Sequence, residues 1–223
     1  MSLLAANGSR IDFGDLAAID GLTAITVAFT IKPTVSLANN RLVHKWGNAA
    51  NAPAFLAQVI DTDNILFVVN NGAGTALRGD KTTDHPLAIG TLSRVVCRWR
   101  ASDQEVNIWV NGAARTDTAV FNNTVSALGT TTASVQVGYE SAEGVNPQSG
   151  DYSEFVIWNR YLTDDEVIQY GKGFSANFMR TGGILYAPLI NANSLGDLWG
   201  GVIATNPITQ GTTADHPSVY HAS

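Results

Sequence analysis

Paired carboxylates are the first residues in this sequence that could do chemistry. Asp151 and Glu154 lie close together in the segment DYSEFVIW. Retaining hydrolysis of a glycosidic bond needs two carboxyl groups about 5 Å apart. Residues at alternate positions of one strand can supply such a pair, because their side chains share a face. A three-residue spacing on a regular strand instead sends the two side chains to opposite faces. We therefore expect no catalytic residues and no enzymatic activity, and glycoside hydrolysis is the least favoured function.

A second acidic group could bind a metal ion. Asp61, Asp63 and Asn64 are clustered between two apolar segments and offer oxygen ligands of the kind that Ca²⁺ prefers. The glycine and the distal glutamate of an EF-hand loop are missing, however, and Asp and Asn are common turn residues because they bond their own backbone. A turn is the favoured interpretation, so we expect no metal and no cofactor, with Asp61 and Asp63 as the candidates if calcium binds.

The four histidines do not form a metal-binding motif. None is spaced as in H-x-x-x-H, and they occur singly at His44, His85, His216 and His221. His85 precedes a proline, which favours an extended conformation and a turn. A structural role is therefore expected for each histidine.

Aromatic and amide side chains could bind a sugar. Trp46 and Asn48 follow a predicted strand, where an aromatic face and an amide could meet a glycan at the rim of a sheet. Trp99, Trp109 and Trp158 lie inside alternating segments and are expected in the core. Trp46 and Asn48 are thus the candidate carbohydrate site, and core packing of Trp46 is the alternative that stays open.

The elements around these residues read as short strands. Only 14% of the residues are charged, and segments rich in β-branched and aromatic residues end at Gly, Pro or Asn. The predicted strand segments are 11–14, 23–33, 40–47, 54–61, 65–72, 94–100, 105–117, 133–140, 151–160 and 184–190.

Two local patterns sharpen this prediction. Alternation in RVVCRWR places Val95, Cys97 and Trp99 on one face and Val96, Arg98 and Arg100 on the other. The pair Asn111-Gly112 suits a type I′ hairpin turn, because both residues tolerate a positive φ.

One helix start is visible in the sequence. Thr163 and Glu166 are spaced as in a capping box, and acidic residues follow the cap. Gly171 or Gly173 could end the helix. We expect one short helix here.

Charge and cysteine content exclude several classes of protein. A net charge of −6 without a basic cluster argues against nucleic acid as a partner. The one cysteine, Cys97, cannot form an intrachain disulfide. Neither a membrane-spanning segment nor a signal peptide is expected, since no apolar stretch is long enough and the first residues lack a basic stretch.

Three segments together resemble the laminin G-like branch of the concanavalin A-like lectin/glucanase superfamily. They are RIDFGDL with LTAITVAFTIKPT, RVVCRWRASDQEVNIWVNGAA, and SGDYSEFVIWNRYLTDDEV, so the resemblance covers residues 9–172. It implies an all-β fold, a two-sheet antiparallel jelly-roll sandwich with one short helix. Calcium-binding members often have an aspartate where this chain has Ser153, and this difference argues against a family-type calcium site.

The resemblance also suggests a division of the chain and a role. Residues 1–180 would form the jelly-roll domain, and residues 181–223 a strand and extended tail that complete the sandwich or contact a neighbour. The tail is similar to closing segments of laminin G-like proteins from tailed phages. The leading expectation is therefore a non-enzymatic virion structural or capsid decoration protein on the virion surface, outside cells, with virion proteins or further copies of itself as partners. The alternative is a carbohydrate-binding lectin or adhesion module with glycans as partners.

Overall fold

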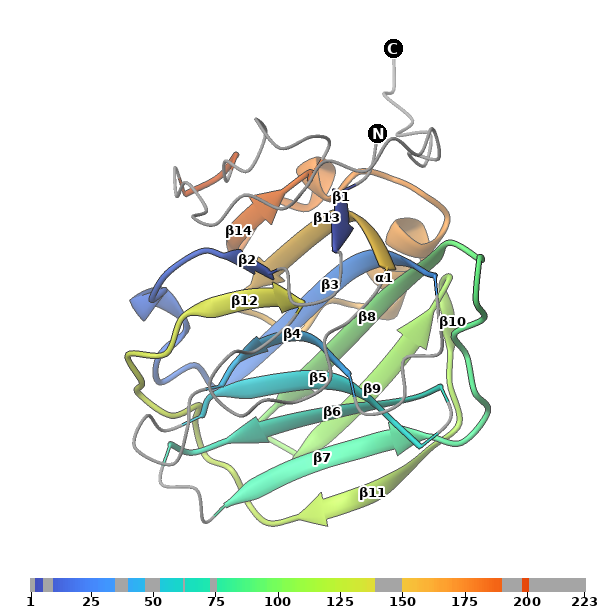
Figure 1. Ribbon diagram of the computed structural model, residues 1–223. Helices are drawn as coiled ribbons and strands as arrows, with labels where there is room; N and C mark the ends of the chain where they lie inside the picture. The colour runs from blue at the N-terminus through green and yellow to red at the C-terminus, as the bar shows by residue number, and fades with distance from the viewer. Residues whose placement is uncertain are drawn as a thin grey trace.

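The computed structural model describes residues 3–5, 10–34, 40–46, 53–61, 63–72, 76–138, 150–189 and 198–200, with backbone only for 3–5. They form two antiparallel sheets of seven strands that pack face to face (Figure 1). This is the two-sheet jelly-roll sandwich that the sequence predicts, and its described part contains one α-helix.

Sheet A has the order β1-β13-β3-β8-β9-β10, and β14 pairs with β13 beside β1. Its strands are β1 (Leu3–Ala5), β3 (Ala24–Pro33), β8 (Ser93–Arg100), β9 (Glu105–Val110), β10 (Ala113–Ala114), β13 (Gly150–Trp158) and β14 (Gly183–Ala187). Because β14 is part of the sheet, the predicted strand of the 181–223 segment belongs to the sandwich.

Sheet B has the order β11-β7-β6-β5-β4-β12-β2. Its strands are β2 (Arg10–Asp12), β4 (Arg41–Lys45), β5 (Phe55–Ile60), β6 (Asn64–Asn70), β7 (Leu77–Thr82), β11 (Asp117–Asn122) and β12 (Val135–Gly138). Strands β4 to β7 follow one another in space as they do in sequence, so most of this sheet is a meander.

The main core lies between the two sheets. Alternate residues of each strand point inward, and in β8 these are Val95, Cys97 and Trp99, as predicted. Burial raises the pKa of the Cys97 thiol, which keeps it protonated and unreactive. Cys97 is therefore a core residue.

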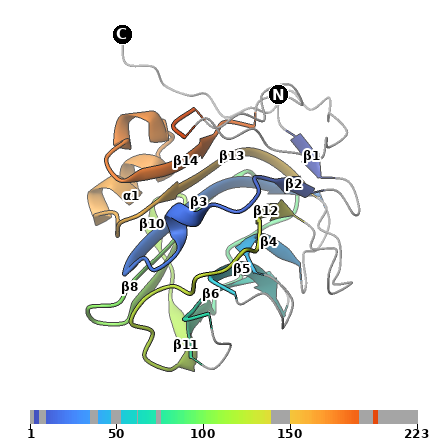
Figure 2. The same ribbon diagram turned by 90° about the vertical axis from the view of Figure 1, so that its left-hand side faces the viewer.

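A second, smaller core lies on the outer face of sheet A. The helix α1 (Asp164–Gly171) and the 3₁₀ turn η2 (Ala176–Met179) cover this face, on the side away from sheet B (Figure 2). Trp158 and Tyr170 meet edge to face there, with ring centroids 6.4 Å apart. This layer fixes the position of α1 on the sheet.

The start of α1 has the predicted capping box. The Thr163 hydroxyl accepts a hydrogen bond from the Glu166 amide at 3.3 Å, and the Glu166 carboxylate accepts one from the Thr163 amide at 2.9 Å. The helix ends at Gly171, where a Cβ would lie 2.0 Å from the Gly112 nitrogen. Helix and hairpin turn therefore touch backbone to backbone.

The prediction that Asp151 and Glu154 point to opposite faces is wrong. The pairing of β13 with β3 shifts between Tyr152 and Glu154, so one extra residue, Ser153, is inserted in β13. A bulge of this kind reverses the alternation. Asp151 pairs with Lys32 and Glu154 with Thr30, and both carboxylates consequently lie on the outer face, where both are buried.

Two turns test the other local predictions. Asn111 and Gly112 have φ values of 54° and 74°, which confirms the predicted turn type between β9 and β10. His85 was expected to be extended, but its φ is 46°. The Asn64 side chain accepts the His85 amide hydrogen at 3.2 Å, and this bond holds the residue in the left-handed region despite the following proline.

Candidate functional site

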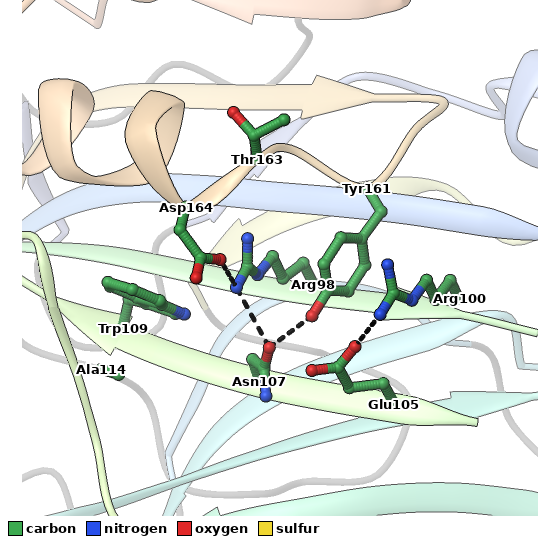
Figure 3. Close-up of a pocket in the computed structure, with 9 residues that line it drawn as sticks. All are labelled: Arg98, Arg100, Glu105, Asn107, Trp109, Ala114, Tyr161, Thr163 and Asp164. Carbon is green, nitrogen blue, oxygen red and sulfur yellow. Dashed lines mark hydrogen bonds and ion pairs between the residues drawn. The ribbon is translucent and has the colours of Figure 1, made fainter. Parts of the chain in front are cut away.

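A pocket opens on the outer face of sheet A, beside the part that α1 covers. Its volume is about 490 Å³, a size typical of ligand sites. The hairpin β8–β9 forms its floor, and the segment leading into α1 forms one wall (Figure 3). The residues that line it are Arg98, Arg100, Glu105, Asn107, Trp109, Ala114, Tyr161, Thr163 and Asp164.

The register of the β8–β9 hairpin explains the floor. Directly opposed residues of an antiparallel pair share one face. The pairs on the outer face are Val96 with Trp109, Arg98 with Asn107, and Arg100 with Glu105. One hairpin therefore supplies two guanidinium groups, an amide, a carboxylate and an indole side by side.

Planar groups stack in a row across this floor. The Arg98 guanidinium carbon lies 5.1 Å from the ring centroid of Trp109 and 4.3 Å from that of Tyr161. Arg100 lies 4.3 Å from the Tyr161 centroid, and Figure 3 shows the Tyr161 ring between the two arginines. Cation–π contacts stabilise such a row and limit side-chain motion.

Arg98 joins the floor to the wall. It is 2% exposed, and it donates hydrogen bonds to the Leu162 carbonyl at 2.5 Å, to Asp164 Oδ1 at 2.5 Å and to Asn107 Oδ1 at 3.1 Å. The Asp164 side chain remains 67% exposed. Arg98 thus holds α1 in place while its partner carboxylate faces the pocket.

Arg100 occupies the outer end of the row. Its Nε donates to both carboxylate oxygens of Asp103, at 2.9 and 3.0 Å, and its Nη2 bonds to Glu105. The hydrogen bond with Asp103 raises the pKa of Arg100 and lowers that of Asp103. Both groups therefore stay charged.

Tyr161 closes the network from the wall. Its hydroxyl donates to Asn107 Oδ1, and burial raises its pKa, with Arg98 acting in the opposite direction. The hydroxyl therefore remains a hydrogen-bond donor at neutral pH.

The pocket offers many hydrogen-bonding groups with balanced charge. Two guanidinium groups, from Arg98 and Arg100, are matched by the carboxylates of Asp164 and Glu105. Donors and acceptors alternate over the floor, as in sites that recognise hydroxyl groups.

The structure places the predicted sugar residues elsewhere. Trp46 is half-buried directly after β4, in sheet B, and does not line the pocket. Asn48 lies outside the described residues.

The predicted metal candidates lie at the β5–β6 turn. Asp61 and Asp63 have φ values of 52° and 74°, and Asp61 forms an ion pair with Lys81 at 3.0 Å. Within the described ranges, no group of three or more His, Cys, Asp or Glu side chains could hold a metal ion. The same part of the chain contains no helix long and apolar enough to cross a membrane.

Sequence reasoning placed Arg98 and Arg100 on the outer face but assigned them no role. The missing step was the register of β8 against β9, which sets Asn107 beside Arg98. The four-residue turn 101–104 could have indicated this register. No pattern in the sequence brings Tyr161 and Asp164 to the same place.

The comparisons with known proteins agree with this fold. A sequence model of the concanavalin A-like lectin/glucanases superfamily matches residues 5–168. No curated protein matches the chain by sequence.

Several solved structures are similar to the chain. A candidate carbohydrate-binding protein from Bacteroides ovatus has a TM-score of 0.70 and 15% identity, covering 99% of this chain and 63% of its own, so this chain spans less than two thirds of that protein. The sialidase module CBM40 of Ruminococcus gnavus, bound to α2,3-sialyllactose, has a TM-score of 0.60 and 14% identity over 76% of this chain and 95% of that one. A heptameric pentraxin from Limulus polyphemus has a TM-score of 0.54 and 16% identity over 77% and 80%. At these identities the likeness concerns the fold.

Proposed function

Because the chain belongs to the concanavalin A-like lectin/glucanases superfamily, we propose that it is a non-enzymatic carbohydrate-binding domain. The glycan binds in the pocket between the β8–β9 hairpin and the start of α1. The observation that carries this proposal is the fixed row of Trp109, Arg98, Tyr161 and Arg100, all four of which line the pocket.

Rigidity of the row supports binding. Each guanidinium group is held by carboxylates as well as by an aromatic ring. Side chains that are already ordered lose little conformational entropy when a ligand arrives. A sugar has little apolar surface, so its binding depends on hydrogen bonds. Hydrogen bonds to charged groups such as these are stronger than those to neutral groups.

A non-enzymatic role fits the position of the predicted carboxylates. Asp151 is 2% and Glu154 8% exposed, and Glu154 is hydrogen-bonded by Tyr170 and Tyr186. Although the bulge puts both on one face, neither carboxylate is accessible to a glycosidic bond. Access to Glu154 would require that α1, which carries Tyr170, leave the sheet.

Proteins of similar structure also support carbohydrate binding as the function. One similar structure is described as a candidate carbohydrate-binding protein, and another is a module bound to sialyllactose. These descriptions favour the lectin alternative of the sequence analysis over its leading expectation.

The virion role remains a prediction. It rested on the tail, and most of residues 181–223 lie outside the described residues. None of the similar structures named above is described as a virion protein. A homo-oligomer in solution and co-purification with virus particles are the outcomes that this role requires.

Glycan-array screening of the purified chain tests the proposed function, with and without a chelator. We expect binding that the chelator does not change, because the pocket needs no metal. Arg100→Met should weaken binding at least about tenfold, the effect of losing one charge-assisted hydrogen bond, and Asn107→Ala, which removes a neutral amide, should weaken it about two- to tenfold. Lys81→Met, which removes an ion-paired cation from sheet B, is the matched control and should bind normally.

Two results would contradict the proposal in different ways. A folded chain that binds no glycan on the array would exclude the function. Binding that survives both pocket substitutions would leave the function intact and exclude this site.

A further inference from the structure

A second hollow lies on the other side of the stacked pair Tyr161 and Arg100. Its volume is about 550 Å³, and these two residues line both hollows. The other residues that line it are Thr23, Ala24, Ala101, Ser102, Gln104, Thr124 and Ser126. One side chain pair therefore separates two neighbouring cavities.

Hydrogen bonds hold the walls of the second hollow together. The Ala101 amide donates to the Thr23 carbonyl at 2.8 Å. Gln104 Nε2 donates to the carbonyls of Ala101 and Val125, at 2.8 and 3.0 Å, while Gln104 Oε1 accepts from the Val125 amide at 2.8 Å. Three segments far apart in sequence are thus fixed around one cavity.

The chemistry of the second hollow differs from that of the first. Its free edge consists of hydroxyl groups, on Thr23, Ser102, Thr124 and Ser126, all of which are exposed. Its one charged residue is Arg100, which it shares with the first hollow. Neutral hydroxyls that can both donate and accept suit another polyhydroxylated unit.

We propose that the two hollows form one groove, which binds a neutral oligosaccharide of at least two sugar units across the Tyr161–Arg100 stack. This inference rests on the proposed function and adds the length and the charge class of the glycan. The shared wall is the reason for proposing a ligand of at least two sugar units. A ligand that fills one hollow ends against Tyr161 and Arg100, which also line the next hollow.

Charge balance is the reason for a neutral ligand. Arg98 is paired with Asp164, and Arg100 with both Asp103 and Glu105. A sugar carboxylate would have to compete with carboxylates already in place. Hydroxyl groups can instead bond to the free edges of these pairs without breaking them.

The test measures affinity against chain length with the full chain. Calorimetric titrations use cello-, xylo-, manno- and galacto-oligosaccharides of one to four units, with α2,3-sialyllactose as the acidic probe. We expect at least a tenfold gain in affinity from the monosaccharide to the di- or trisaccharide of the series that binds, and weaker binding of sialyllactose.

Two substitutions each place an indole at a residue that lines the second hollow. Ser126→Trp and Ser102→Trp should each remove the gain with length and leave the affinity for the monosaccharide unchanged. Thr118→Trp, at an exposed position of β11, controls for adding a surface indole and should keep the gain.

The outcomes separate this inference from the proposed function. Equal affinity for all chain lengths, or a gain that survives both tryptophan substitutions, would exclude the extended groove while carbohydrate binding stands. Preference for sialyllactose would exclude the neutral class. A chain that binds none of the saccharides used would overturn both proposals.

Discussion

The outer face of sheet A has a covered half and an open half. Over β13 and β3, α1 and η2 exclude water from a layer of aromatic and aliphatic side chains. Over β8 and β9, the face carries arginines, carboxylates and an amide around a pocket (Figure 3). The two halves thus differ both in the side chains that they carry and in whether a helix covers them.

The two halves also differ in how their carboxylates are paired. In the open half, the carboxylates of Asp164 and Glu105 each bond to an arginine. In the covered half, Glu154 Oε1 has no hydrogen-bond partner among the described residues. Burial raises the pKa of Glu154, and Tyr170, Arg94 and Tyr186 offset this only in part. The covered half is therefore a packing layer, and the open half is where the proposed glycan site lies.

Removing the largest side chain of the covered half should have the greatest effect on stability. Trp158 is fully buried, packs against Tyr170 and donates to the Met179 carbonyl at 2.7 Å. Trp158→Ala should lower the free energy of unfolding by about 3 to 5 kcal/mol, measured by urea denaturation. Val120→Ala, exposed on β11, should change it by less than about 0.5 kcal/mol; comparable losses would show that the covered layer adds nothing.

The two arginines of the pocket should separate stability from binding. Arg98→Met leaves the Leu162 carbonyl without its donor and should cost about 2 to 3 kcal/mol of stability. Arg100→Met removes more exposed ion pairs and should cost less than about 1 kcal/mol. Both should reduce glycan affinity. Equal stability losses in denaturant would mean that Arg98 does not anchor α1.

The covered carboxyl should make stability depend on pH. A raised pKa in the folded state means that the stabilising contribution of Glu154 is complete below its unfolded value of about 4.5 and declines as pH rises toward the folded value. The decline for one proton is at most about 1.4 kcal/mol per pH unit. Glu154→Gln should remove it, so its advantage over the wild type should grow between pH 4 and pH 8.

Urea denaturation across that pH range checks this expectation. Asp165→Asn, which removes an exposed carboxyl, is the control for the loss of one charge. Tyr186, whose pKa burial raises to about 12, stays protonated throughout the range. Parallel profiles for Glu154→Gln and the wild type would show that the carboxyl is not destabilising when ionised.

A substitution at the boundary between the two halves should have a small effect on stability. Thr163 caps α1 and also lines the pocket. Thr163→Ala should cost about 1 kcal/mol, detected as a lower melting temperature, and Thr163→Ser should restore most of it. A serine variant as unstable as the alanine variant would assign the effect to the lost methyl group instead of the cap.

Much of the fold could be predicted because its signals are local. Alternation in residues 94–100, the Asn111-Gly112 turn and the capping box at Thr163 each depend on a few neighbouring residues. Strands β1, β7 and β11 were not predicted. The residues of β7 and β11 are largely polar, with Gly79 in β7 and an exposed pattern in β11. β11 is the edge strand of sheet B and β7 lies next to it, where packing demands fewer apolar side chains.

The candidate site could not be predicted because it depends on long-range contacts. Arg98 and Asn107 lie side by side because of the register between β8 and β9. Arg98 and Asp164 are in contact only because the chain from β13 into α1 returns to the same face of sheet A. The bulge at Ser153 is similar, since a single inserted residue reversed the predicted orientation of Glu154. Neither effect has a signal within one segment.

The strand order also has a consequence for the time course of folding. The meander β4 to β7 pairs strands that are neighbours in sequence. The pairing of β3 with β13, in contrast, joins segments that lie far apart in the chain, and such pairings form slowly. During synthesis, the β8–β9 hairpin leaves the ribosome before Tyr161 and Asp164 exist. Arg98 is therefore displayed without Tyr161 and Asp164, although Trp109 and the ionic partners of Arg100, which are Asp103 and Glu105, are already present in the hairpin. The pocket is complete only in the last steps of folding.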